Sequence, residues 1–161
     1  MHPPGDLAAQ IVSVLEERGQ TLATAESLTG GLLAAAITAV PGASAVYRGG
    51  VTAYATELKA VLLGVPADLL ARHGPVHPDV AAAMAAGARD RLGAAWGLAT
   101  TGVAGPDPVD GFPPGTVHIA ASAGSPTTRS LALAGGRDQV RRETVDQALM
   151  LLLELLREDC P

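Results

Sequence analysis

The sequence predicts an α/β fold, a three-layer α/β/α sandwich with a mixed sheet, formed by a single domain over residues 1–161. Short apolar runs alternate with helical patterns between residues 6 and 101, which indicates strands joined by helices that cover both faces of a sheet. Two further strand-like runs around Gly124 resemble a hairpin, which adds antiparallel strands. A hydrophobic content of 48% with 17% charged residues is typical of a folded chain.

Apolar spacing, glycines and prolines place the elements of the first half. A helix capped by Asp6 is expected to end near Gly19, and a strand follows over 20–25. A helix over 31–40 is stopped by Pro41. The next expected elements are a loop over 43–50, a strand over 51–55, a helix over 57–63 capped by Thr56, a helical turn over 66–72 and a helix over 79–92.

The second half begins with a short apolar strand over 94–101 and a glycine-rich turn over 101–107. A proline-rich surface loop over 108–114 precedes the hairpin strands, expected over 115–123 and 127–133. The last helix is expected over 137–157. It is apolar around much of its circumference, including Met150, Leu151 and Leu153, so we expect burial on two sides and a homodimer.

Charge and composition exclude several classes of partner. A net charge of −5 and only four aromatic residues disfavour a nucleic-acid surface. The most apolar segments, 28–40 and 149–156, are too short or too interrupted to span a membrane. The N-terminal residues lack a signal-peptide pattern, and the single cysteine, Cys160, permits no internal disulfide, so a cytoplasmic protein is expected. No Cys/His cluster has zinc-ligand spacing.

Ser27 is the candidate nucleophile because it follows a strand and opens a helix. Gly30 and Gly31 follow it, and unpaired backbone N–H groups at such a turn suit an anion or a developing oxyanion. The alternative is that Ser27 or Thr29 only caps the helix, which an isolated motif of this kind favours. The position of three turns favours the functional interpretation. The turns at 27–31, 54–59 and 101–107 all follow strands, and ligands bind at the ends of strands in α/β folds.

A serine nucleophile needs a base, and the histidines offer no evident triad. Lys59 is the only lysine of the chain; if it is enclosed, desolvation lowers its pKa enough for a neutral amine to accept the serine proton. A solvated surface lysine is the alternative. Tyr54 is a candidate to relay that proton, or else it packs with its hydroxyl at the surface. Glu26 would bind a ribose hydroxyl, pair with Lys59, or stay an exposed charge.

An anion site is expected where glycines lead into the last helix. Arg137, Arg141 and Arg142 offer guanidinium groups suited to phosphate, although at least one of them should belong to an exposed, ion-paired first turn. The turn after the central strand adds hydroxyl and N–H donors from Thr101, Gly102 and Gly105. Neither a dinucleotide-binding fingerprint nor a Walker loop is present.

Together these motifs resemble the CinA carboxy-terminal domain family, the bacterial nicotinamide-nucleotide amidases also called competence/damage-inducible proteins. The resemblance is collinear from about residue 20 to residue 142. It is carried by Ala25-Glu26-Ser27-Leu28-Thr29-Gly30-Gly31, Pro41-Gly42-Ala43-Ser44, Gly50-Val51-Thr52-Ala53-Tyr54, Glu57-x-Lys59, Leu63-Gly64-Val65, His73-Gly74-x-Val76, Thr101-Gly102-x-Ala104-Gly105-Pro106-Asp107 and Gly115-Thr116-Val117. Many members carry an additional N-terminal domain, and this chain resembles the stand-alone form.

The resemblance implies hydrolysis of nicotinamide mononucleotide to nicotinate mononucleotide and ammonia in pyridine-nucleotide salvage, without a metal or cofactor, by a dimer. Ser27 matches the family's nucleophile, and Tyr54 and Lys59 match its catalytic tyrosine and lysine. The residues implied to bind the substrate are Glu26, Thr29, Gly30, Gly31, Gly50, Thr101, Gly102, Gly105, Arg137 and Arg141, with Arg137 the best candidate for the phosphate.

Three departures from the family pattern stand near this site. Leu28 replaces a usual cysteine, Ala55-Thr56 replaces Ser-Asn, and the loop over 108–114 is proline-rich instead of glycine-rich and charged. A non-catalytic nucleotide-binding or partner-binding module of the same fold is therefore the competing expectation.

Overall fold

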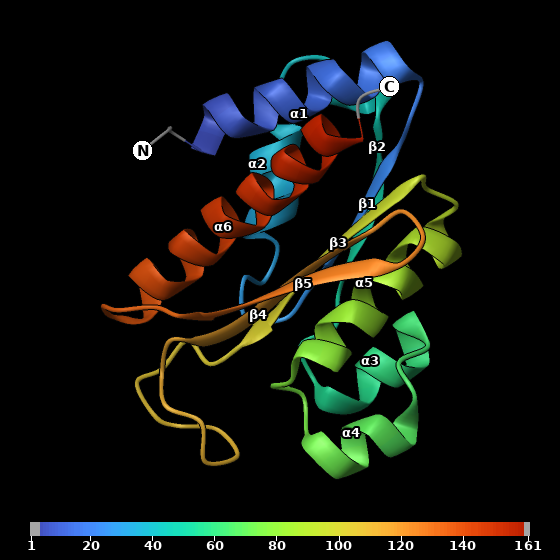
Figure 1. Cartoon of the computed structure of the whole chain (residues 1–161). Helices are drawn as coiled ribbons and strands as arrows, with labels where there is room; N and C mark the ends of the chain where they lie inside the picture. Colours follow the sequence, from blue (N-terminus) through green and yellow to red (C-terminus); the bar gives the residue numbers. More distant parts are fainter. Residues whose placement is uncertain (1–3, 160–161) are drawn as a thin grey trace.

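A five-stranded mixed sheet runs through the molecule with helices on both faces, in a computed structural model that describes residues 4–159 (Figure 1). The strand order is β2-β1-β3-β4-β5. β1 is parallel to β2 and β3, whereas β4 is antiparallel to both β3 and β5. The strands are β1 (Leu22–Glu26), β2 (Tyr47–Thr52), β3 (Trp96–Gly102), β4 (Thr116–Ser122) and β5 (Pro126–Ala132). The predicted α/β class and mixed sheet are confirmed.

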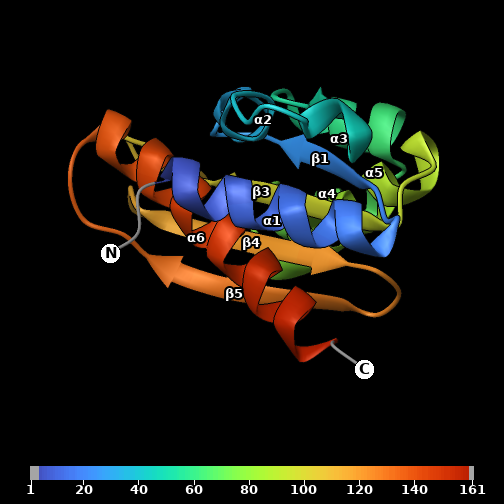
Figure 2. The same ribbon diagram turned by 90° about the horizontal axis from the view of Figure 1, so that it is seen from above.

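The helices form two layers. One layer holds α1 (Pro4–Arg18), α2 (Leu32–Thr38) and α6 (Arg137–Glu158), and Figure 2 shows α1 and α6 side by side along the sheet. The other layer holds α3 (Thr56–Leu63), α4 (Ala67–His73) and α5 (Pro78–Leu92), and a short 3₁₀ turn, Ala43–Ala45, leads into β2. Alternation along the strands fills both cores: Leu22, Leu98 and Ile119 face the first layer, and Ala23, Ala99 and Ala120 face the second.

Small side chains let α5 pack closely on the sheet. A Cβ added at Gly97 of β3 would collide with the carbonyl oxygen of Ala85 in α5. A Cβ at Gly87 of α5 would collide with the carbonyl oxygen of Leu63, so α3 also lies directly against α5. These close approaches hold α5 directly against β3 and against the end of α3.

Several expected boundaries were wrong. β2 spans Tyr47–Thr52 rather than 51–55, so the segment Arg48-Gly49-Gly50 belongs to the strand. Gly50 is needed there because a Cβ would overlap the hydroxyls of Thr24 and Tyr47. Asp6 lies inside the first turn of α1 rather than capping it, and Thr56 is the first residue of α3, whose cap position makes no side-chain hydrogen bond.

The apolar circumference of α6 is largely explained within the chain. Leu151 and Leu153 are buried, and Leu155 is partly buried, because α6 packs against α1, α2 and the sheet. Met150 is the one large hydrophobic side chain of α6 that is exposed among the described residues. The homodimer therefore stays a prediction. Within residues 4–159, no helix is both long enough and apolar enough to cross a membrane. Cys160 lies outside the described residues.

Candidate active site

Three strand ends meet where the connections leave the parallel strands. The N–H of Ser27, just after β1, donates to the carbonyl oxygen of Thr100 in β3 over 3.1 Å, and the N–H of Ala53, just after β2, donates to the carbonyl oxygen of Glu26 over 2.9 Å. The connection from β1 to β2 crosses one face of the sheet, and the connection from β2 to β3 crosses the other. In α/β folds, ligands bind at the carboxyl ends of the strands where two connections diverge in this way. The pocket here has a volume of about 200 Å³ and is lined by Ser27, Leu28, Tyr54, Gly102, Val103, Ala104, Gly105, Asp107, Val109 and Arg137.

Lys59 points from α3 into the protein and meets the hydroxyl of Ser27. Its side chain is 0% exposed, and its Nζ lies 2.9 Å from the Ser27 Oγ. The same nitrogen donates to the carbonyl oxygen of Ala53 over 2.7 Å and to that of Tyr54 over 3.5 Å. A neutral amine has two N–H bonds and one lone pair, so the two carbonyls account for the donors and the lone pair faces the serine hydroxyl.

Burial changes the acid–base properties of this amine. Desolvation lowers the pKa of Lys59 from its ordinary value of 10.5 to about 8, and the carboxylate of Glu57 opposes that shift. The nearest neighbours are neutral oxygens, and no carboxylate forms an ion pair with Lys59 within residues 4–159. A substantial fraction of the amine is therefore neutral near pH 8, where it is able to accept a proton.

Tyr54 and Arg137 form the outer wall of the pocket. Tyr54 is 61% exposed, and its hydroxyl accepts a hydrogen bond from Arg137 Nη2 over 3.2 Å. Arg137 also donates from Nη1 to the carbonyl oxygen of Gly105 over 2.6 Å, which ties the first turn of α6 to the loop after β3. Arg137 is the one of the three candidate arginines that lines this pocket.

Glu26 holds the start of α2. It is 2% exposed, and its carboxylate accepts hydrogen bonds from the N–H groups of Gly31, Leu33 and Ala34. The alternatives of a pairing with Lys59 and of an exposed charge are wrong, because Glu26 is buried and Lys59 Nζ hydrogen-bonds to Ser27 and to two carbonyl oxygens instead. The N–H groups at the start of α2 therefore bind a carboxylate of the chain itself, and donors for a substrate have to come from the turn before α2.

The turn residues divide into structural and pocket-lining positions. Thr29 is buried and shares a 2.8 Å hydrogen bond between its hydroxyl and that of Thr100, whereas the hydroxyl of Thr101 donates to the carbonyl oxygen of Pro75. Gly102 and Gly105 have positive φ angles and line the pocket. A Cβ at Gly102 would come within 2.5 Å of the carbonyl oxygen of Thr116, so the β3–β4 approach requires glycine.

Arg141 and Arg142 are not among the residues that line the pocket. Arg141 donates from Nε to the carbonyl oxygen of Leu28 over 2.9 Å and from Nη2 to that of Thr29 over 3.3 Å. Arg142 is exposed and forms an ion pair with Asp138 one helical turn away. The expectation that one of the three arginines belongs to an exposed, ion-paired turn is met by Arg142.

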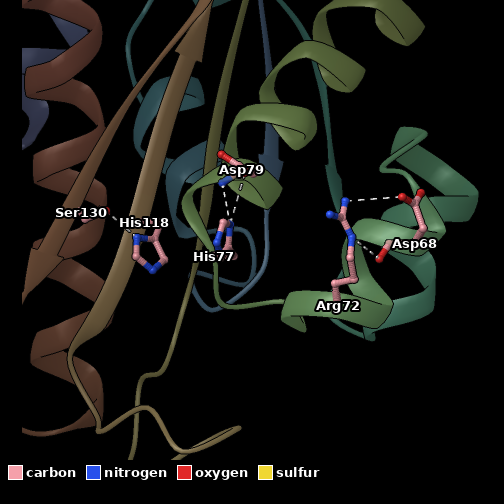
Figure 3. A network of polar contacts seen from close by, with 6 residues as sticks. All are labelled: Asp68, Arg72, His77, Asp79, His118 and Ser130. Atoms are coloured by element: carbon pink, nitrogen blue, oxygen red, sulfur yellow. Dashed lines mark hydrogen bonds and ion pairs between the residues drawn. The ribbon is translucent and has the colours of Figure 1, made fainter.

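The described histidines are engaged elsewhere. His77 accepts the N–H of Asp79 at the start of α5 and stacks on His73 with ring centroids 4.0 Å apart. His118 of β4 shares a 2.8 Å hydrogen bond with Ser130 of β5 (Figure 3). Burial lowers the pKa of His118, and none of the three hydrogen-bonds to Ser27. Among residues 4–159, no group of three or more potential ligand side chains is placed to hold a metal ion.

The family assignment rests on a match over most of the chain. The family model of the CinA C-terminal domain matches residues 5–156. The chain belongs to the CinA C-terminal domain family. A "CinA-like protein" of Frankia casuarinae is 53% identical over 151 residues, which cover 93% of this chain, and a "putative competence-damage inducible protein" of Geobacillus kaustophilus is 46% identical over 91% of it. The chain spans about a third of the length of these two curated relatives, 35% and 36%.

Solved structures of the CinA superfamily have the same fold. A CinA superfamily protein of Klebsiella pneumoniae is 34% identical with a TM-score of 0.94, covering 98% of this chain and 99% of that one. A competence/damage-inducible protein of Agrobacterium tumefaciens is 36% identical with a TM-score of 0.91, covering 96% and 98%. The whole fold described above is thus shared with CinA superfamily proteins.

Sequence reasoning missed several parts of this CinA-family site. The carbonyl oxygens of Ala53 and Tyr54 orient the Lys59 amine, and no side-chain pattern reports a backbone acceptor. Val109 lines the pocket from the proline-rich loop, where the sequence indicated only a surface segment. Asp107, which also lines it, lies within the glycine-rich turn that the sequence did single out.

Proposed function

We propose that this chain is a nicotinamide mononucleotide deamidase that forms nicotinate mononucleotide and ammonia in pyridine-nucleotide salvage, with Ser27 as nucleophile and Lys59 as base. One observation carries the proposal: the only lysine of the chain is fully buried and lies 2.9 Å from the hydroxyl of Ser27. An enclosed amine with a pKa near 8 is suited to activate serine, whereas a solvated lysine is not.

Acylation begins when neutral Lys59 takes the proton of Ser27 as the oxygen attacks the carboxamide carbon. The carbonyl π electrons move onto the oxygen and give a tetrahedral oxyanion. Protonated Lys59, with help from the Tyr54 hydroxyl, returns a proton to the nitrogen, the C–N bond breaks, and ammonia leaves. Water then attacks the ester with Lys59 again as base, and the acid and the free serine are released.

The oxyanion needs donors that are not already used. The N–H groups of Leu28 and Thr29 have no hydrogen-bond partner within residues 4–159, and both follow the nucleophile directly. Backbone donors fixed in a rigid turn stabilise a developing charge without reorganising, and each contributes roughly 3 kcal/mol in characterised enzymes. We therefore assign the oxyanion site to this turn rather than to the start of α2, which Glu26 occupies.

Size and charge favour a nucleotide that enters ring first. A pocket of about 200 Å³ is smaller than the roughly 300 Å³ of the smallest typical ligand sites, so it suits the pyridine carboxamide while the ribose phosphate extends outward. Arg137 stands at the outer wall, where a guanidinium is placed to pair with a phosphate. Arg137 is therefore our candidate for the phosphate, as the sequence suggested.

The test is release of ammonia and nicotinate mononucleotide from nicotinamide mononucleotide. Ser27→Ala should abolish turnover, and Ser13→Ala, a change at an exposed serine of α1, is the matched control that should leave it intact. Calorimetry on the same samples measures binding of the nucleotide. If wild-type protein binds the nucleotide but releases no ammonia, the chain is a nucleotide-binding module of this fold and the amidase assignment fails.

A further inference from the structure

We propose that Arg141 is a positioning residue that polarises the backbone N–H groups of the Ser27 turn. This inference rests on the proposed nucleophile, and it goes beyond it because Arg141 touches neither the pocket nor the reacting atoms. Arg141 was expected to bind the substrate; instead its guanidinium hydrogen-bonds to two carbonyl oxygens of the turn, those of Leu28 and Thr29.

One link is direct. Arg141 Nε donates to the Leu28 carbonyl oxygen over 2.9 Å, and that carbonyl shares its peptide unit with the N–H of Thr29. A positive charge on a carbonyl oxygen draws electron density through the peptide resonance and makes the N–H of the same unit a stronger donor. The Thr29 N–H has no partner within the described residues, so the gain is available to an oxyanion.

The second link passes through two peptide units. Arg141 Nη2 donates to the Thr29 carbonyl oxygen over 3.3 Å, which polarises the N–H of Gly30. That N–H donates to the carbonyl oxygen of Ser27 over 3.1 Å, which in turn polarises the N–H of Leu28. Hydrogen bonds in such a chain strengthen one another. Hydrogen bonds and peptide units therefore connect the Arg141 guanidinium to both unpartnered N–H groups, those of Leu28 and Thr29.

The surroundings of Arg141 preserve its charge for this use. No carboxylate forms an ion pair with it in the described part of the chain, whereas Arg142 is neutralised by Asp138. Gly30 leaves the room that the guanidinium occupies: a Cβ there would lie 3.2 Å from Arg141 Nη2, on a residue with φ of +57°. The half-buried guanidinium holds two N–H donors in a fixed plane, and each donates to one carbonyl oxygen. A lysine ammonium has no such fixed pair of donors.

The experiment measures the reactivity of Ser27 with a fluorophosphonate probe, whose attack also places negative charge on an oxygen. The serine oxygen forms a P–O bond, the P–F bond breaks, Lys59 takes the serine proton, and fluoride leaves. Rates are measured for wild type, Arg141→Gln, Arg141→Lys and Arg142→Gln, with melting temperatures for each. On the deamidase reaction, kcat and KM are determined separately.

Arg141→Gln should lower the phosphonylation rate and kcat about 10- to 100-fold while KM stays within about twofold, because the donors lose strength and alignment but the pocket lining is unchanged. The phosphonylation rate and kcat of Arg141→Lys should lie between those of Arg141→Gln and wild type. If Arg141→Gln does not fold, the lysine variant supplies the measurement. Arg142→Gln should match wild type. Rates for both Arg141 variants within about twofold of wild type would overturn the proposal. If the phosphonylation rate depends on Arg141 but the protein releases no ammonia, the proposed deamidase activity is wrong. The role of Arg141 in positioning the Ser27 turn would still be supported.

Discussion

Replacing Lys59 by methionine should change how stability depends on pH. Methionine fills a similar volume without a titratable amine, and Lys59 is the only lysine of the chain, so the comparison isolates one group. In the folded protein the pKa of Lys59 is lowered by burial to about 8, against 10.5 when the chain is unfolded. Between these two values the unfolded chain binds the proton and the folded chain does not, so stability rises with pH across this window.

The magnitude follows from the width of the window. At about 1.4 kcal/mol per pH unit, the charged form of Lys59 costs the folded protein roughly 3 kcal/mol below pH 8, and most of this cost disappears by pH 10. The free energy of unfolding of wild type relative to Lys59→Met should therefore rise by about 2 kcal/mol between pH 7 and pH 10. The Ala53 carbonyl loses its donor in the variant, but that loss is the same at every pH.

Urea unfolding of both proteins at a series of pH values measures this difference. Tyrosines, histidines and carboxylates titrate in both proteins and cancel in the subtraction. Curves for the two proteins that stay parallel from pH 7 to pH 10 would refute the reasoning, because they would show that the amine titrates alike in the folded and unfolded chain.

Three further predictions concern the site. With Lys59 as the proposed neutral base, kcat/KM for deamidation should rise with pH and level off above about 8, and a pH–rate profile that is flat from pH 6 to pH 9 would contradict this assignment. Arg137→Gln should raise KM for the nucleotide about 10- to 100-fold with a smaller effect on kcat, measured by initial rates, and an unchanged KM would remove Arg137 from the phosphate site. Glu26→Gln should lower the free energy of unfolding by about 3 kcal/mol, since three backbone N–H groups lose a charged acceptor, and chemical denaturation with less than about 1 kcal/mol of loss would show that the cap matters little.

Much of the fold follows from local patterns in the sequence. Apolar runs, together with glycines and prolines, predict most elements close to their observed bounds, because most strands and helices here carry their own spacing signal. The bounds of β2 were mispredicted because its side chains alternate between partly buried and exposed positions and because two glycines lie within it. Whether a glycine pair ends a loop or lies inside a strand depends on the neighbouring strand, here on Thr24.

The site was predictable where residue type carries the chemistry. Ser27 and Lys59 stand out by residue type, as a turn serine and a sole lysine, and the structure brings them 2.9 Å apart. Arg137 is one of three candidate arginines by residue type, and only the family resemblance favours it for the phosphate. Glu26 and Arg141 were expected to contact the substrate but are held by backbone groups, the first by N–H donors and the second by carbonyls. Backbone hydrogen-bond partners of this kind depend on the tertiary arrangement of the chain. The sequence alone does not distinguish a charged side chain that binds a ligand from one that hydrogen-bonds to the backbone.

The most direct test of the central claim is to trap the acyl intermediate on Ser27. Wild-type protein mixed with saturating nicotinamide mononucleotide, quenched in acid and analysed by mass spectrometry of its peptides, should carry the nicotinate mononucleotide acyl group on the peptide that contains Ser27. Lys59→Met should show no adduct, because the hydroxyl then lacks its base. Ammonia released by wild type at quench times shorter than one turnover, with Ser27 unmodified, would contradict nucleophilic catalysis by this serine.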